Sequence, residues 1–155
     1  MSKRQVPIIL RAPDNGDRER FSEWYNADRE GMEQFFGTEL PTEQDYIRQF
    51  TRIFGLMRQY TARMLMAELK GDVLGFVLVP DIPPSLKFGR VHIYLAPPKR
   101  RYAVRVGKAG MEEVEHMGIQ TVFQNVLADN SGAIKLGKKL GFNPSPIMTM
   151  IKEFH

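Results

Sequence analysis

The sequence predicts a mixed α/β fold, with one central sheet and helices on both of its faces. Three observations carry this prediction. Strand-like apolar runs and amphipathic helical stripes succeed one another along the chain. Two β-rich runs meet at a Gly-Asp turn, which is typical of an antiparallel hairpin. The C-terminal half alternates strands and helices, as crossover connections require. No linker or repeat divides residues 1–155, so we expect a single domain.

The N-terminal part predicts one strand and two helices. Val6 to Leu10 is a short apolar run that ends before a proline. Turn and cap residues from Asp14 to Asp17 precede a helix with three aromatic residues at helical spacing: Phe21, Trp24 and Tyr25. Thr42 caps a second helix, which has acidic residues in its first turn. The apolar stripe of this helix is Tyr46, Ile47, Phe50, Ile53, Phe54 and Met57.

The middle of the chain predicts an antiparallel meander. The hairpin strands are Arg63 to Leu69 and Val73 to Val79, and Gly75 in the second strand indicates a bulge. A loop from Asp81 to Gly89 follows, and Val91 to Ala96 is the third strand.

The C-terminal part predicts two more helices and two more strands. The expected elements are a helix from Ala103 to Met117 that stops at Gly118, a strand from Ile119 to Leu127, a helix from Asn130 to Leu140, and a last strand from Ile147 to Glu153. The expected order is therefore β-α-α-β-β-β-α-β-α-β.

Composition and charge exclude several classes of protein. The chain has no cysteine, which excludes disulfides, thiolate metal sites and a cysteine nucleophile. The histidines, His92, His116 and His155, are too far apart to suggest a metal site. The net charge of +4 comes from interspersed charges of both signs. Neither a membrane span nor a signal peptide is evident, so we expect a cytoplasmic protein.

The segment NVLADNSGAIKLGKKLGF, from Asn125 to Phe142, resembles the GCN5-related N-acetyltransferase (GNAT) superfamily. The family's motif is matched at Asn130, Ala133, Leu136, Lys139, Gly141 and Phe142. RAPDNGDRERFSEWYNAD looks like the family's opening strand and helix, and ELKGDVLGFVLV looks like its central hairpin. With the element order, the resemblance covers nearly the whole chain.

This resemblance implies acetyl coenzyme A as cosubstrate, in a V-shaped gap between the strand of Val91 to Ala96 and the strand of Ile119 to Leu127. The family's diphosphate loop falls on Lys99 to Val104, where the usual glycines are missing. An arginine side chain there either closes the site or replaces amide contacts with guanidinium contacts. Arg100 and Arg101 are candidates for the second role, because a guanidinium matches phosphate oxygens bidentately. The implied cofactor-binding residues are Ile93, Leu95, Lys99, Arg100, Arg101, Tyr102, Ala103, Val104, Asn130 and Ala133.

The resemblance also implies direct attack of an amine on the thioester, which needs no enzyme nucleophile. His92, or a carboxylate working through water, is the candidate for removing the amine's proton. The family's usual tyrosine, which protonates the leaving thiolate, is replaced by Gly137. Candidate substitutes are Tyr94, Tyr102 and Ser131.

Three functions remain open at this point. The first is an N-acetyltransferase that acts on an amine of a small molecule or a protein. The second is a member of the fold that has lost catalysis and serves as a binding or structural component, of the kind found in phages and mobile elements. The weakest is nucleic-acid binding through Lys99 to Arg105, which has one aromatic residue and no recognisable module. A homodimer is a further expectation, because an unpaired edge at the last strand would recruit a partner strand.

Overall fold

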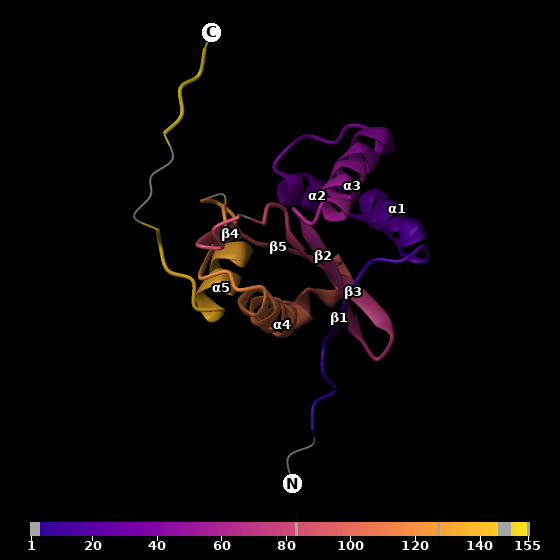
Figure 1. Cartoon of the computed structure of the whole chain (residues 1–155). Coiled ribbons are helices and arrows are strands. Elements are labelled where there is room, and N and C mark those ends of the chain that lie inside the picture. The colour runs from indigo at the N-terminus through magenta and orange to yellow at the C-terminus, as the bar shows by residue number, and fades with distance from the viewer. Residues whose placement is uncertain (1–3, 83, 127, 146–149, 155) are drawn as a thin grey trace. The chain divides into compact units, whose positions relative to one another are not determined.

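The computed structural model describes residues 4–82, 84–126, 128–145 and 150–154. The chain forms two compact units, Met1–Asn125 and Val126–His155. The elements of the first unit are β1 (Ile9–Arg11), α1 (Asp17–Ala27), α2 (Arg29–Phe36), α3 (Glu43–Arg58), β2 (Arg63–Leu69), β3 (Asp72–Val79), β4 (Phe88–Arg90), β5 (His92–Leu95), the 3₁₀ helix η1 (Pro97–Tyr102), α4 (Ala103–His116) and β6 (Thr121–Phe123). The second unit contains α5 (Ser131–Lys139) (Figure 1).

Two sheets organise the first unit. The larger sheet has the order β1-β2-β3-β5, and every neighbouring pair in it is antiparallel. The smaller sheet pairs β4 with β6 in parallel. This combination confirms the expected mixed α/β class and the antiparallel hairpin of β2 and β3, but the strands are divided between two sheets where the sequence predicts one.

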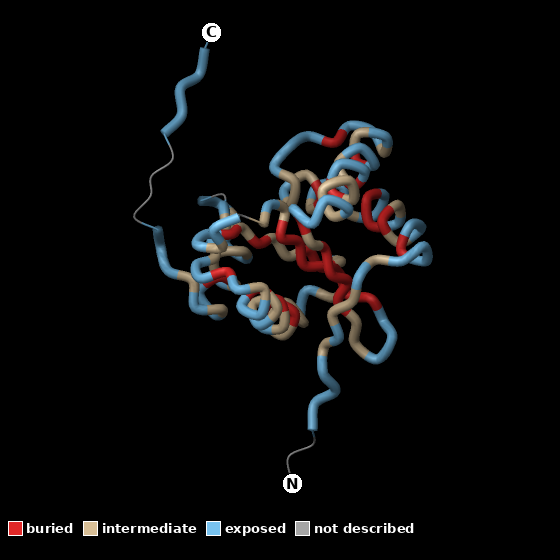
Figure 2. Tube along the Cα trace, in the orientation of Figure 1, coloured by how far each residue is buried: buried red, intermediate tan, exposed pale blue. Residues whose placement is uncertain are grey.

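The two faces of the larger sheet carry different side chains. Alternation along β3 sends Phe76 and Leu78 to one face and Val77 to the other. On the first face an aromatic cluster packs against helices α1, α2 and α3. Its buried members include Phe21, Trp24, Tyr25, Tyr46, Phe50, Phe76 and Tyr94. Helix α4 lies on the opposite face, where Gly110 packs against the Val77 side chain. Figure 2 shows the buried positions concentrated in the strands and the facing sides of these helices.

Helix α3 forms as the sequence predicts. The Thr42 hydroxyl accepts a hydrogen bond from the amide of Asp45, and the Asp45 carboxylate accepts one from the amide of Thr42. This reciprocal capping box satisfies two amides that a helix N-terminus leaves without partners. Burial of the apolar stripe then fixes the helix on the aromatic face of the sheet.

The element order differs from the expected one in three places. Helix α2 is additional, with Asp28 as its N-cap and Gly37 in the left-handed conformation at its end. The expected third strand, Val91 to Ala96, is β5, and strand β4 is additional: it begins within the expected loop of Asp81 to Gly89 and pairs with β6. Of the expected last strand, residues 147–149 lie outside the described residues and Met150 to Glu153 form no strand.

A bulge interrupts the β2–β3 ladder where the sequence predicts one. Ala67 lies opposite Gly75 and Glu68 opposite Val73, so the intervening residue of β3 is unpaired. A Cβ atom at Gly75 would lie 1.9 Å from the carbonyl oxygen of Tyr94. Glycine at this position therefore allows β5 to approach β3.

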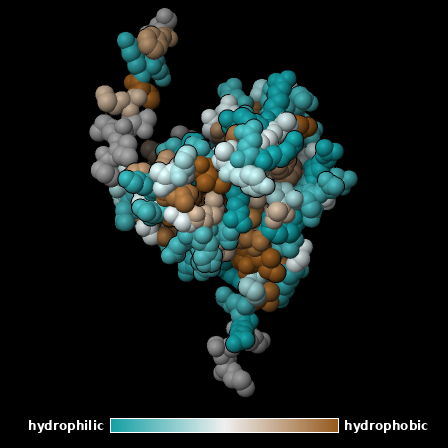
Figure 3. Space-filling model, in the orientation of Figure 1, coloured by the Kyte–Doolittle hydropathy of each residue, from teal (hydrophilic) through white to brown (hydrophobic). Residues whose placement is uncertain are grey.

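Within the described part of the chain, no helix is long and apolar enough to cross a bilayer. Figure 3 shows a largely hydrophilic face with separate hydrophobic patches.

Candidate functional site

The run from β4 to β5 changes its pairing partner at Val91. The Val91 amide donates to the carbonyl oxygen of Phe123 at 3.3 Å, which extends the contact of β4 with β6. Five residues later, the Ala96 amide donates to the carbonyl oxygen of Leu74 at 3.0 Å, on the β3 side. The chain thus leaves β6 and continues along β3, so β5 is an edge strand of the larger sheet.

The free edge of β5 presents backbone groups. In an antiparallel pair, hydrogen-bonded residues alternate with residues whose amide and carbonyl groups point away from the partner strand. The Ala96–Leu74 bond makes Tyr94, opposite Phe76, a residue that faces β3. Ile93 and Leu95 therefore direct their N–H and C=O groups away from β3. Among the described residues no strand pairs with this edge. Both residues are predicted cofactor contacts.

The expected diphosphate loop is helical. Lys99 to Tyr102 belong to η1, while Ala103 and Val104 begin α4. None of these residues has a positive φ angle. A continuous helical backbone of this kind needs no glycine. The turn carries three consecutive basic side chains, Lys99, Arg100 and Arg101.

Each basic side chain of η1 has a partner within the protein. The Lys99 Nζ atom lies 2.6 Å from a carboxylate oxygen of Asp72, and Arg100 lies 3.1 Å from a carboxylate oxygen of Asp28. Arg101 donates to the hydroxyl of Tyr102 at 3.0 Å and lies over the same ring, 4.8 Å from its centroid. These side chains are partly or largely exposed, so water competes for the contacts and each contributes little to stability.

Asp28 is a residue of the site that the sequence did not single out. It lies between α1 and α2, and its Oδ2 atom accepts hydrogen bonds from the Tyr94 hydroxyl at 2.9 Å and from Arg100 at 3.1 Å. Its Oδ1 atom accepts the Gly31 amide at 3.2 Å. The local sequence indicates the contact with Gly31 alone, since this glycine follows Asp28 by three residues. The other two partners, Tyr94 and Arg100, are far away in the sequence.

His92 and Tyr94 point to the aromatic face of the sheet. The His92 ring lies 5.6 Å from that of Phe35, and Tyr94 packs against Trp24 and Phe76. Burial, with a smaller effect of the Arg90 charge, lowers the pKa of His92. Burial and the hydrogen bond to Asp28 raise the pKa of Tyr94. At neutral pH the imidazole is therefore neutral and the phenol keeps its proton.

The remaining predicted residues lie in different surroundings. Tyr102 is half-buried at the end of η1 and contacts Arg101. In the second unit, the Asn130 side chain caps α5 by accepting the Ala133 amide at 3.2 Å. Ser131 is exposed at the start of that helix, and Gly137 is buried within it. No group of His, Asp or Glu residues that could hold a metal occurs in the described part of the chain.

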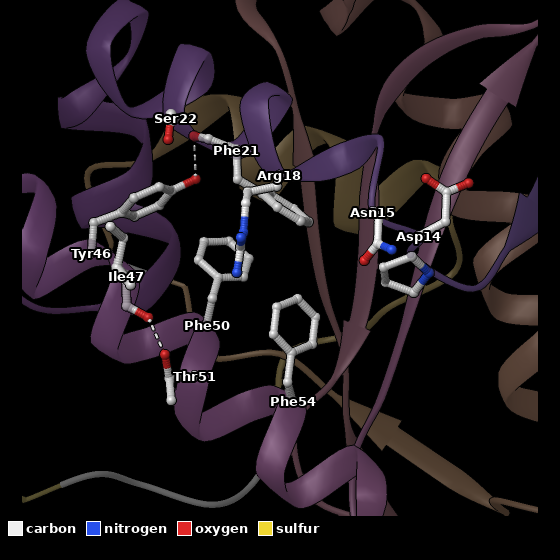
Figure 4. Close-up of a pocket in the computed structure, with 11 residues that line it drawn as sticks. Asp14, Asn15, Arg18, Phe21, Ser22, Tyr46, Ile47, Phe50, Thr51 and Phe54 are labelled. Atoms are coloured by element: carbon white, nitrogen blue, oxygen red, sulfur yellow. Dashed lines mark hydrogen bonds between the residues drawn. The ribbon is translucent and has the colours of Figure 1, made fainter.

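A separate pocket lies between the start of α1 and helix α3, with a volume of about 550 Å³. Figure 4 shows Phe21, Phe50 and Phe54 along it and Arg18 reaching across it. The Tyr46 hydroxyl donates to the carbonyl oxygen of Phe21 at 2.8 Å, which ties α3 to α1. None of the predicted site residues lines this pocket.

Several solved acetyltransferases share this fold. A spermidine N-acetyltransferase from Vibrio cholerae, in complex with CoA and spermine, superposes with a TM-score of 0.75 at 18% identity, over 96% of this chain and 86% of that one. RimJ from Mycobacterium smegmatis, in complex with CoA-disulfide, gives 0.74 at 14% identity, over 91% and 74%. An acetyl transferase from Salmonella typhimurium that modifies the N-terminal serine of ribosomal protein L7/L12 gives 0.70 at 12% identity, over 89% and 81%.

The fold is thus the one that these solved acetyltransferases share. The family model of the acetyltransferase (GNAT) domain matches residues 8–143. The chain therefore belongs to the GNAT acetyltransferase family, as the motif near its C-terminus predicts. None of the curated proteins with which it was compared matches it.

Proposed function

We propose that this protein transfers an acetyl group from acetyl coenzyme A to an amine of a small molecule or a protein. The unpaired edge of β5, followed directly by the basic turn η1, carries the proposal. A strand edge suits the amide-bearing pantetheine arm, which binds like an added strand. Lys99, Arg100 and Arg101 provide the positive charge that the phosphate groups require. The residues present thus fit the cosubstrate.

The backbone of β5, the side chain of His92 and a hydroxyl group perform the chemical steps. Acetyl coenzyme A supplies an activated thioester, whose carbon forms a bond to the amine nitrogen while its bond to sulfur breaks. An amide on the free edge of β5, at Ile93 or Leu95, stabilises the negative charge on the thioester oxygen. His92, neutral at physiological pH, accepts the proton of the amine directly or through water. The candidate donors to the leaving thiolate are Tyr94, Tyr102 and Ser131. Burial and the hydrogen bond to Asp28 raise the pKa of Tyr94, which makes it a weaker acid than a free tyrosine and favours the other two.

The titration of the protein with acetyl coenzyme A tests this proposal. We expect micromolar-range binding, and weakening by at least about tenfold in the Arg100→Ala/Arg101→Ala double variant, because each arginine contributes charge-assisted hydrogen bonds to phosphate. Calorimetry measures both values, with coenzyme A and adenosine 3′,5′-bisphosphate as comparison ligands. Arg52→Ala on α3 is the matched control, since Arg52 is exposed and outside the site. No binding to the wild type, or equal binding to the double variant, contradicts the proposal.

A fold that keeps the cosubstrate site and lacks catalysis is the second candidate. Gly137 at the position of the family's tyrosine favours it, because glycine cannot protonate a thiolate. Binding of acetyl coenzyme A without transfer to any member of a panel of amines separates this candidate from the enzyme. The identity of the acceptor and the homodimer stay predictions.

A further inference from the structure

One carboxylate links the helix α2, the strand β5 and the turn η1. Asp28 follows α1 and caps α2, and its Oδ2 atom accepts from both the Tyr94 hydroxyl on β5 and the Arg100 guanidinium on η1. The carboxylate is well covered, since the Asp28 side chain is 13% exposed. Arg100 is 58% exposed, so it can leave Asp28 at little cost. The ion pair thus joins a carboxylate held in place, that of Asp28, to a guanidinium that is free to move, that of Arg100.

The neighbouring backbone is shaped to hold this carboxylate. A Cβ atom on Gly31 would lie 2.1 Å from the Oδ2 atom of Asp28, so glycine leaves the space that the carboxylate occupies. The Gly31 amide also donates to Oδ1. Asp28 therefore keeps two partners, the amide of Gly31 and the hydroxyl of Tyr94, when Arg100 turns away.

We propose that Asp28 is a positioning residue that holds Arg100 in the absence of cosubstrate and competes with the cosubstrate's phosphates for this guanidinium. The proposal rests on the proposed function, in which Arg100 binds phosphate. An arginine that satisfies one anion must release it before it makes a bidentate contact with another. Binding of acetyl coenzyme A then includes the exchange of the Asp28–Arg100 pair for a phosphate–Arg100 pair, and the lost pair lowers the observed affinity.

Removing the charge of Asp28 should therefore tighten binding. In Asp28→Asn, we expect the dissociation constant for coenzyme A to fall by about two- to fivefold, the factor that an ion pair with one exposed partner is worth. Asparagine is also a good N-cap, so α2 is retained. Asp28→Ser, which caps as well and carries no carboxylate, is expected to show the same gain. Calorimetry gives the constants, and thermal unfolding checks that each variant is folded.

Two comparisons separate this competition from simple repulsion of an anionic ligand. Glu30→Gln removes the same charge from an exposed position on α2 and should leave the affinity unchanged. In an Arg100→Ala background, Asp28→Asn should not increase the affinity for coenzyme A, because the guanidinium for which Asp28 and the phosphates compete is absent. Equal or weaker binding in folded Asp28→Asn and Asp28→Ser overturns the inference, and so does an equal gain in the Arg100→Ala background. If the wild type does not bind coenzyme A, the proposed function itself is overturned. If the wild type binds and the Asp28 variants bind no more tightly, only the present inference is overturned.

Discussion

Replacement of Gly75 by alanine is expected to lower the free energy of unfolding by about 3 kcal/mol or more. The added Cβ would lie 1.9 Å from the carbonyl oxygen of Tyr94 and 2.8 Å from the Cα atom of Leu95. Both contacts are with backbone atoms, which no change of rotamer can move. The variant must either separate β5 from β3 or distort the bulge in β3.

Urea unfolding measures this effect, and coenzyme A binding reports its consequence for the site. Because the same displacement moves the free edge of β5, we expect binding to weaken together with stability. Gly55→Ala is the matched control. Gly55 is in the middle of α3, where an added Cβ meets no atom within 4 Å. Removing a helical glycine there should raise stability by about 0.5–1 kcal/mol. A Gly75→Ala protein as stable as the wild type would contradict the described approach of the two strands.

The second large effect is expected at Asp17, the buried carboxylate at the start of α1, which is 0% exposed. It accepts hydrogen bonds from the two terminal guanidinium nitrogens of Arg11, at 2.8 and 2.9 Å, and it is also paired with Arg20. The Asp14 amide donates to it at 2.9 Å. Asp17→Asn removes the charge that these groups surround, so we expect a loss of about 3 kcal/mol in urea unfolding.

Asp14→Asn provides the control for Asp17. Asp14 is also an aspartate near Arg11, at 3.5 Å, but its side chain is 64% exposed. Its loss should cost less than about 1 kcal/mol, as is usual for exposed ion pairs. Equal effects of the two substitutions would contradict the assignment of Asp17 as the buried centre of this charge cluster.

The Asp17 cluster also predicts a pH dependence. Burial alone raises the pKa of this carboxyl, but the hydrogen bonds from Arg11 and the Asp14 amide and the charges of Arg11 and Arg20 lower it below 3.8 overall. A lowered pKa in the folded state stabilises the protein above pH 3.8, and this stabilisation is lost as the pH falls through the folded-state value. The difference in stability between wild type and Asp17→Asn should therefore be full at neutral pH and shrink in acid.

The sequence predicts those elements whose determinants are local. Helix α3 carries both its capping box and its apolar stripe within one segment, and the hairpin of β2 and β3 carries its own turn. Helix α2 was missed because it has only 8 residues and includes Gly31, which weakens a helical pattern. Strand β4 is also not visible locally, since it has only 3 residues and forms by pairing with β6, which lies far away in the sequence.

The same distinction applies to the site. The basic run from Lys99 to Arg101 and the strand with His92 and Tyr94 can be found by inspection, because each is contiguous. Asp28 cannot, since its partners Tyr94 and Arg100 lie 66 and 72 residues away in the sequence. The helical form of residues 99–102 differs from the expected loop, whereas the helix that begins at Ala103 agrees with the sequence. The role of each candidate residue in transfer stays a prediction.

The aromatic face of the sheet has a practical consequence for all of these experiments. Trp24 is the single tryptophan of the chain and is 8% exposed. Its ring is stacked 5.8 Å from that of Phe76 and lies 5.6 Å from that of Tyr94. The fluorescence emission of one natural indole thus originates beside the strand that borders the site. The unlabelled protein carries its own spectroscopic reporter, which a shift of β5 or unfolding brings into a new solvent environment.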